Sequence, residues 1–157
     1  MRRLALSSFV GFLALCAYGI ATASAAGYSN ATLAGSFACI GSGYAQIKDA
    51  KGASTWVPST SVLQTTGDAS GAFTGSFTTN TAGLVCSGTF KGTGTTNPDG
   101  SGSGTANGTP AASNPAQCPP GGTPLHNVSV IASPNSFYLI GTDPGFTGWT
   151  LCTRQTQ

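Results

Sequence analysis

Turn-forming residues divide the chain between residues 33 and 154 into short segments, and this division constrains the fold most. Asp and Asn accept local hydrogen bonds, Gly tolerates positive φ, and Pro presets φ, so clusters of these residues predict turns. The clusters are at 68–71, 80–83, 97–100, 133–136 and 143–145. Between them, apolar residues alternate with polar ones, which is the period of β-strands. The pattern therefore predicts an all-β domain.

The alternation predicts eight strands, and the strand boundaries follow the turn clusters. The predicted strands are 33–40, 61–67, 72–79, 84–95, 101–107, 127–132, 137–142 and 148–154. One short segment, 45–51, favours a helical turn. The stretch 106–124 is rich in Pro and Gly, and we expect a long loop in it from Thr109 to Pro124.

Consecutive short strands favour an up-and-down antiparallel arrangement. A meander of this size avoids exposed edges best when it closes, so we predict a small β-barrel of about eight strands. The glycines along the strands suit the tight bends of such a barrel. A two-sheet β-sandwich is the alternative.

The N-terminus has the pattern of a secretory signal peptide. Arg2 and Arg3 precede a short apolar run, and Ala23-x-Ala25 has the small residues of a cleavage site. The run is short for a membrane anchor, which is the alternative. We expect cleavage after Ala25, which gives a signal peptide at 1–25 and one mature domain at 26–157, secreted or periplasmic and not membrane-spanning.

Four cysteines remain in the mature chain, namely Cys39, Cys86, Cys118 and Cys152. They lie far apart and form no C-x-x-C motif, so two disulfides are a better interpretation than a zinc site. Four cysteines allow three connectivities. We favour Cys39–Cys152, which would join the chain ends, and Cys86–Cys118, which would hold the long loop.

Charged residues make up 6% of the chain, against about 25% in an ordinary soluble domain. Without residues 1–25, four basic side chains balance four Asp, and there is no Glu. This composition excludes a nucleic-acid binder with a basic face, and it leaves few groups for acid–base catalysis.

Several turn-centred motifs resemble a group of small secreted bacterial β-proteins of unknown function. The motifs are Gly71-x-x-Thr74-Gly75, Cys86-Ser87-Gly88-Thr89-Phe90-Lys91-Gly92-Thr93, Asn97-Pro98-Asp99-Gly100-Ser101-Gly102, Gly141-Thr142-Asp143-Pro144-Gly145 and Arg154-Gln155. The resemblance spans roughly residues 33–155. It implies a signal peptide and a compact antiparallel barrel-like domain, and it assigns no catalytic residue.

Three polar features are candidate sites. The Asn97–Asp99 turn has part of a calcium loop, but it lacks the closing bidentate carboxylate, so a plain turn is favoured. His126 is the only histidine, and no G-x-S-x-G motif accompanies it, so we expect a solvated loop residue instead of a catalytic base. Asp143 and Arg154 flank the last hairpin, where a surface ion pair is favoured over a ligand-binding pair.

Aromatic residues are the other candidates. Phe73, Phe77, Phe90 and Leu139 fall on one face of their strands and would line a barrel cavity. A second set would form an apolar or sugar-stacking site or pack in the core. These residues are Tyr44, Trp56, Tyr138 and Trp149.

We therefore expect an exported, non-enzymatic barrel with a structural or binding role, without cofactor or metal. The alternatives are a carrier of a small hydrophobic ligand, with a lipocalin-like cavity, and a hydrolase or isomerase centred on His126 or Asp143. The expected partners are a small hydrophobic ligand or an envelope component. A barrel interior filled with side chains would exclude the carrier.

Overall fold

The structure is a computed structural model that describes residues 27–48, 51–118, 121–122 and 124–156. The predicted signal peptide and its cleavage site at Ala25 lie outside the described residues, and so does Cys16. Within the described part of the chain, no helix is long and apolar enough to cross a membrane.

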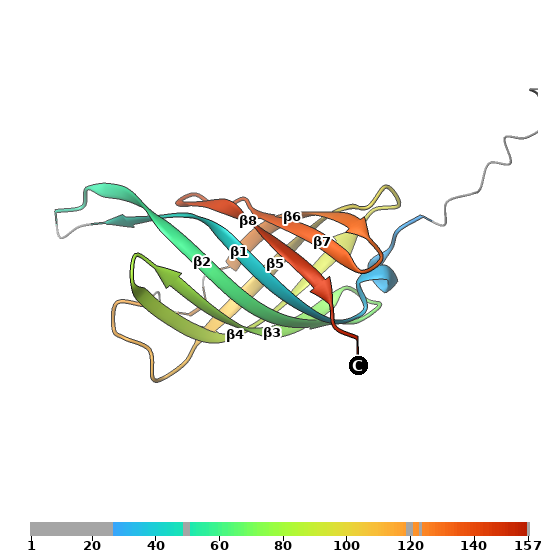
Figure 1. The fold of residues 1–157 in the computed structure, drawn as a ribbon, viewed down its shortest axis with the longest axis horizontal. Coiled ribbons are helices and arrows are strands. Elements are labelled where there is room, and N and C mark those ends of the chain that lie inside the picture. Colours follow the sequence, from blue (N-terminus) through green and yellow to red (C-terminus); the bar gives the residue numbers. More distant parts are fainter. Residues whose placement is uncertain (1–26, 49–50, 119–120, 123, 157) are drawn as a thin grey trace, which may run out of the picture.

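Eight antiparallel strands close into a single barrel in sequence order, with β1 pairing with β8 (Figure 1). A short 3₁₀ helix, η1 (Asn30–Leu33), precedes them. The strands are β1 (Gly35–Lys48), β2 (Ser54–Gly67), β3 (Ala72–Thr81), β4 (Leu84–Thr96), β5 (Ser101–Pro110), β6 (Pro124–Ser133), β7 (Ser136–Gly141) and β8 (Phe146–Arg154). The up-and-down barrel is confirmed, and the sandwich alternative is wrong.

The predicted turns are present, and local hydrogen bonds hold them. The Asp68 carboxylate accepts hydrogen bonds from the backbone N–H and the hydroxyl of Ser70, at 2.8 and 2.5 Å. Asp99 accepts the same two bonds from Ser101, at 2.9 and 2.7 Å. Asp99 is thus part of a plain turn. In both turns the serine hydroxyl bond is the main cause that lowers the pKa of the aspartate.

The first two strands are longer than the alternation predicts. The helical turn expected at 45–51 is wrong, because residues 45–48 belong to β1. β2 begins at Ser54, seven residues before the predicted start. Gln46–Lys48 pair only with β2, and 54–58 pair only with β1. The β1–β2 hairpin therefore projects beyond the other strands (Figure 1).

The buried core lies at one end of the barrel, where β1 begins and β8 ends. Phe37, Phe137 and Ile131 pack there against the Cys39–Cys152 disulfide, and Cys152 is fully buried. The Phe37 and Phe137 rings meet edge to face at 5.0 Å. We call this end the packed end and the opposite end, with the projecting hairpin, the open end.

Both favoured disulfides are confirmed. Cys39 and Cys152 are direct partners in the pairing of β1 with β8, so their bond closes the barrel where its first and last strands meet. Cys86–Cys118 joins β4 to the loop between β5 and β6. β5 extends to Pro110, so this loop is shorter than the predicted Thr109–Pro124.

Candidate functional site: the barrel cavity

The barrel encloses a cavity of about 650 Å³. Side chains from all eight strands line it. The large apolar ones are Leu63, Phe73, Phe77, Phe90, Leu125, Leu139 and Phe146, together with Phe37 and Phe137 at the packed end. The four residues that the alternation placed inside, Phe73, Phe77, Phe90 and Leu139, are among them. The barrel interior is thus hollow over much of its length.

The hollow interior follows from the small residues that point inward from β4 and β5. On β5 the inward positions are Gly102, Gly104, Ala106 and Gly108. A Cβ added at Gly108 would have only one heavy atom within 4 Å, a ring carbon of Phe77 at 3.8 Å. Inward side chains of ordinary size would fill a barrel of eight strands.

The inward phenylalanines of β3 and β4 each lie directly opposite a glycine of the neighbouring strand. The pairs are Phe73 with Gly92, Phe77 with Gly88 and Phe90 with Gly75. A Cβ on any of these glycines would lie only 2.5 to 2.9 Å from the nearest carbon of the facing ring. Each ring therefore lies across its glycine, which fixes its position on the wall and keeps the centre of the cavity free.

The segment before β1 closes the packed end. Asn30 of η1 donates to the carbonyl of Ser70 at 3.1 Å and accepts from the N–H of Thr96 at 2.8 Å. These bonds fasten η1 to two neighbouring turns. Tyr28 lies over Gly100, where a Cβ would meet its ring at 2.9 Å.

Arg154 belongs to this packed end and does not pair with Asp143. Its guanidinium donates to the carbonyls of Ala34 and Thr32, at 2.6 Å each, and lies 4.6 Å from the centre of the Phe37 ring. The predicted pair is wrong because Asp143 precedes β8 and Arg154 ends it. At about 3.3 Å per residue, the nine-residue strand keeps them roughly 30 Å apart.

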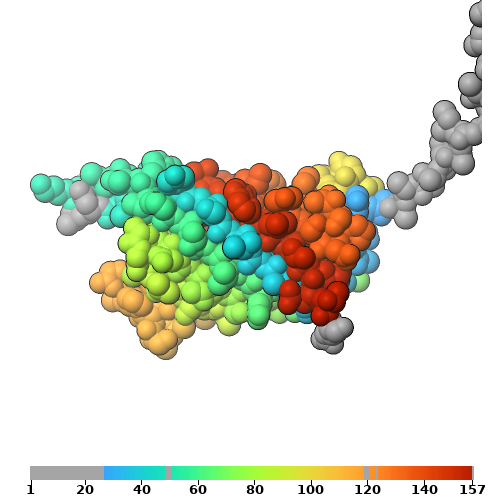
Figure 2. Space-filling model, in the orientation of Figure 1, coloured from blue at the N-terminus to red at the C-terminus, as the bar shows by residue number. Residues whose placement is uncertain are grey.

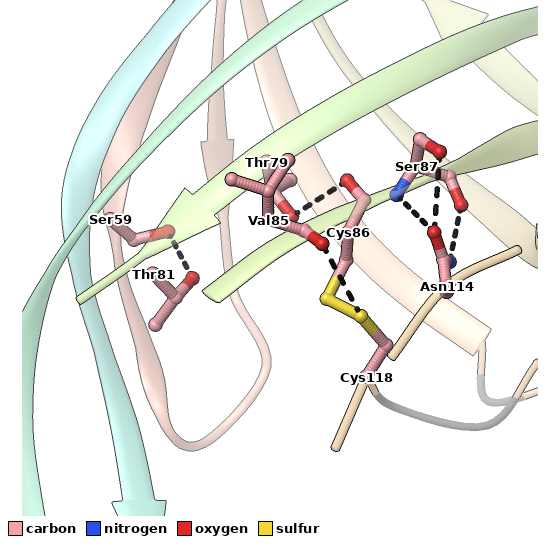
Figure 3. The surroundings of a disulfide bond; sticks show 8 residues. All are labelled: Ser59, Thr79, Thr81, Val85, Cys86, Ser87, Asn114 and Cys118. Carbon is pink, nitrogen blue, oxygen red and sulfur yellow. Dashed lines mark hydrogen bonds between the residues drawn. A yellow bond between two sulfur atoms is a disulfide. The ribbon is translucent and has the colours of Figure 1, made fainter. Parts of the chain in front are cut away.

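The open end is bordered by the β5–β6 loop, which two sets of bonds attach to β4 (Figure 3). The first is the Cys86–Cys118 disulfide. In the second, Asn114 accepts from the backbone N–H of Ser87 at 3.0 Å and donates to its carbonyl at 2.6 Å. The attached loop contributes Asn114 and Cys118 to the lining of the cavity at this end.

His126 and Asp143 form a pair at the open end. Nδ1 of His126 lies 2.7 Å from Oδ1 of Asp143, and the backbone N–H of His126 donates to Oδ2 at 2.5 Å. These bonds lower the pKa of Asp143, and the bond to the imidazole has the largest effect. His126 lies in β6 and not in the predicted loop, and its side chain is about half exposed, as a solvated residue would be.

The pair has two of the three parts of a hydrolytic triad. A carboxylate holds Nδ1, which fixes the orientation of the imidazole. The backbone of His126 pairs with Thr105 of β5 and bonds to Thr142, and its side chain bonds to Asp143. Among the hydrogen bonds of the described residues, none joins the imidazole to a hydroxyl group. Chemically, the pair can position a proton at the imidazole. No cluster of metal-ligating side chains occurs in the described ranges either.

The second set of aromatic candidates lies outside the barrel. Tyr44, Trp56, Tyr138 and Trp149 are all exposed, and none lines the cavity. They alternate with inward residues on their strands, so the expectation that they pack in the core is wrong, and an apolar or sugar-stacking site on the outer surface stays a prediction. Trp149 in particular is 48% exposed on the outer face of β8.

No known protein-family model, curated protein or solved structure matches the chain. The resemblance to small secreted bacterial β-proteins therefore stays a prediction.

Proposed function

We propose that this protein binds a small apolar molecule inside its barrel and acts as a carrier or binding protein without catalytic activity. The observation that carries the proposal is the cavity of about 650 Å³ with its phenylalanine and leucine wall. Small-molecule sites have volumes of about 300–1,000 Å³ and mainly apolar linings. A filled interior would have excluded a carrier.

The polar groups near the cavity support a ligand with little charge. The titratable side chains that line it, Asp68, His126 and Asp143, already have hydrogen-bond partners. The central part of the wall presents aromatic and aliphatic groups and glycines, so binding would depend on the burial of apolar surface, worth about 25 cal/mol per Å².

We place this function in the periplasm or outside the cell. Two disulfides support an oxidising compartment. The residues that predict export, at the N-terminus, supply the second argument. We prefer a carrier to the hydrolase and isomerase alternatives because the apolar cavity supports ligand binding directly, whereas, among the described residues, the hydrogen bonds of the His126 imidazole include no hydroxyl nucleophile for a hydrolase.

The first prediction tests the cavity directly with the substitution Gly108→Leu. The inward position at Gly108 has room for a side chain, so leucine would occupy the cavity without displacing the wall. We expect the affinity for N-phenyl-1-naphthylamine, an uncharged apolar fluorescent probe, to fall about tenfold or more, a loss of about 1.4 kcal/mol. Fluorescence titration of the mature protein measures it.

Thr109→Leu is the matched control, because it adds the same side chain to the outward neighbouring position. This variant should bind the probe as the wild-type protein does. Equal affinities in all three proteins would contradict the proposal, since the probe would then bind outside the barrel. Native mass spectrometry of the protein from its own host would identify the natural ligand.

A further inference from the structure

An unbroken row of apolar side chains crosses the outside of the barrel over five adjacent strands. Each member is the direct cross-strand partner of the next. In order from β6 through β7, β8 and β1 to β2, the row is Val130, Tyr138, Leu151, Ile40 and Val62. Four of the five are 40–58% exposed, and Leu151 at the centre is partly buried by its neighbours.

A second, shorter row lies beside the first on β6, β7 and β8. Val128 faces Ile140, and Ile140 faces Trp149 across the strands. The rings of Trp149 and Tyr138 meet edge to face at 6.5 Å and connect the two rows. We call these eight residues the outer apolar face. Figure 2 shows β1, β2, β7 and β8 uncovered by other described segments on the side in view.

The outward side chains of β3, β4 and β5 are mainly polar, in contrast to those of the outer apolar face. Most carry hydroxyl, amide or ammonium groups, and Val85 near the open end is the apolar exception. The polar ones are Thr74, Ser76, Thr78 and Asn80 on β3, Ser87, Thr89, Lys91, Thr93 and Thr95 on β4, and Ser101, Ser103, Thr105, Asn107 and Thr109 on β5. The outside of β3, β4 and β5 is therefore polar apart from Val85, and the continuous apolar rows are confined to β6, β7, β8, β1 and β2.

We propose that the outer apolar face binds the same face of a second copy of this chain and forms a two-fold symmetric dimer. Monomeric soluble proteins rarely expose apolar patches larger than a few hundred Å². Seven of the eight residues are 40–58% exposed and adjoin one another across the strands, so together they present a continuous patch on the order of several hundred Å². A standard stable interface buries about 800 Å² on each partner.

The chemistry of the face also fits a copy of itself. Neither row contains a charged side chain, so two identical faces meet without repulsion between like charges. In a two-fold interface the same patch contacts itself, which requires a self-complementary surface. The aromatic pair Tyr138 and Trp149 lies beside the centre of the face, and residues of these types contribute most where an interface is fully desolvated.

The experiment measures the mass of the mature, disulfide-bonded chain by sedimentation velocity across the micromolar range. We expect the wild-type protein to sediment as a dimer. Ile40→Lys places a charge in the middle of the long row and should weaken dimerisation at least 100-fold. Thr89→Lys adds the same charge to the outside of β4, where the cross-strand partners are Ser76 and Thr109, and should leave the dimer intact.

Two further measurements keep each outcome decisive. Far-UV circular dichroism checks that the variants fold, and Tyr138→Ser replaces Ile40→Lys if that variant does not. In a Trp56→Phe background, Trp149 is the only tryptophan, and its emission should shift to shorter wavelength as the dimer forms. A wild-type monomer at all concentrations would overturn the proposal. So would a dimer that Ile40→Lys leaves intact, or a monomer that cosediments with phosphatidylcholine vesicles through Ile40.

Discussion

The packed end and the open end of the barrel are closed by different means. At the packed end, Phe37 and Cys152 are almost completely buried, and the Arg154 guanidinium donates to backbone carbonyls of the segment before β1. At the open end, the β5–β6 loop is held by one disulfide and the bonds of Asn114. Stability within a protein is not uniform, and segments with few buried contacts open first. We therefore expect the packed end to supply the stability and the open end to admit the ligand.

The largest difference between the ends should appear when each disulfide is removed. Cys39–Cys152 closes 113 residues and Cys86–Cys118 closes 32. The chain-entropy model gives losses of about 5 and about 4 kcal/mol in the free energy of unfolding. Replacing both cysteines of the first bond with alanine also removes buried sulfur atoms, which increases its loss. Guanidinium unfolding of the two double variants, followed by circular dichroism, measures the difference.

Each double variant serves as the control for the other, because each removes one disulfide and two cysteines. The Cys86–Cys118 variant should keep the cooperative transition of the barrel, since that bond holds a loop. An equal loss in the two variants, or a larger one at the open end, would contradict the division of the barrel into two ends.

Two phenylalanines of the interior should also differ, with losses smaller than the loss expected for the Cys39–Cys152 bond. Phe37→Ala removes a ring that is 1% exposed in the packed core, and Phe→Ala in a core costs about 3–5 kcal/mol. Phe77→Ala removes a ring that borders the cavity and already lacks neighbours on one side. We expect it to cost about half as much, because fewer contacts are lost. Urea unfolding at neutral pH compares them.

If Phe77→Ala costs as much as Phe37→Ala, the cavity wall is packed as tightly as the core. The barrel would then have no loose interior for a ligand. Together with the probe titration of Gly108→Leu, this comparison separates a wall that binds a ligand from a wall that only supports the fold.

Much of the fold could be predicted because it depends on local signals. Turns such as Asn97–Gly100 depend on a few neighbouring residues. So does the alternation in β3 that places Phe73 and Phe77 on the same face. Both were predicted. The first hairpin was missed at 41–48 and 54–60, and the outermost residues, 46–48 and 54–58, pair only with each other. Its alternation is weak because no barrel interior selects the side chains of that projecting part.

The sites were harder to predict because they depend on which strand ends share an end of the barrel. Asp143 lies beside His126, and Arg154 lies beside Ala34. Neither contact can be inferred before the up-and-down path of the strands is known. The hollow interior had a signal in the sequence, since Gly or Ala recurs at every second position from 102 to 108. Reading it required knowing that these positions face inward.

The smallest expected effect concerns the His126–Asp143 pair at the open end. It is a change in how the free energy of unfolding depends on pH. The hydrogen bonds from His126 lower the pKa of Asp143 in the folded state. A group whose pKa is lowered on folding adds stability above its unfolded pKa, which is ~3.9 for Asp, and this stability is lost as the pH falls through the folded value. Asp143→Asn should therefore remove part of the loss of stability below about pH 4.

Asp68 and Asp99 have lowered pKa values too, so the difference between wild type and Asp143→Asn isolates the one carboxylate. Asp68→Asn is the matched control, because it removes a comparable exposed turn carboxylate at the packed end. NMR titration of the carboxyl carbons should place the pKa of Asp143 below that of a free aspartate. In a His126→Ala variant this shift should largely disappear, while those of Asp68 and Asp99 remain. A shift of Asp143 that persists without the imidazole would mean that the backbone N–H alone holds the turn, and that the histidine does not help to order the open end.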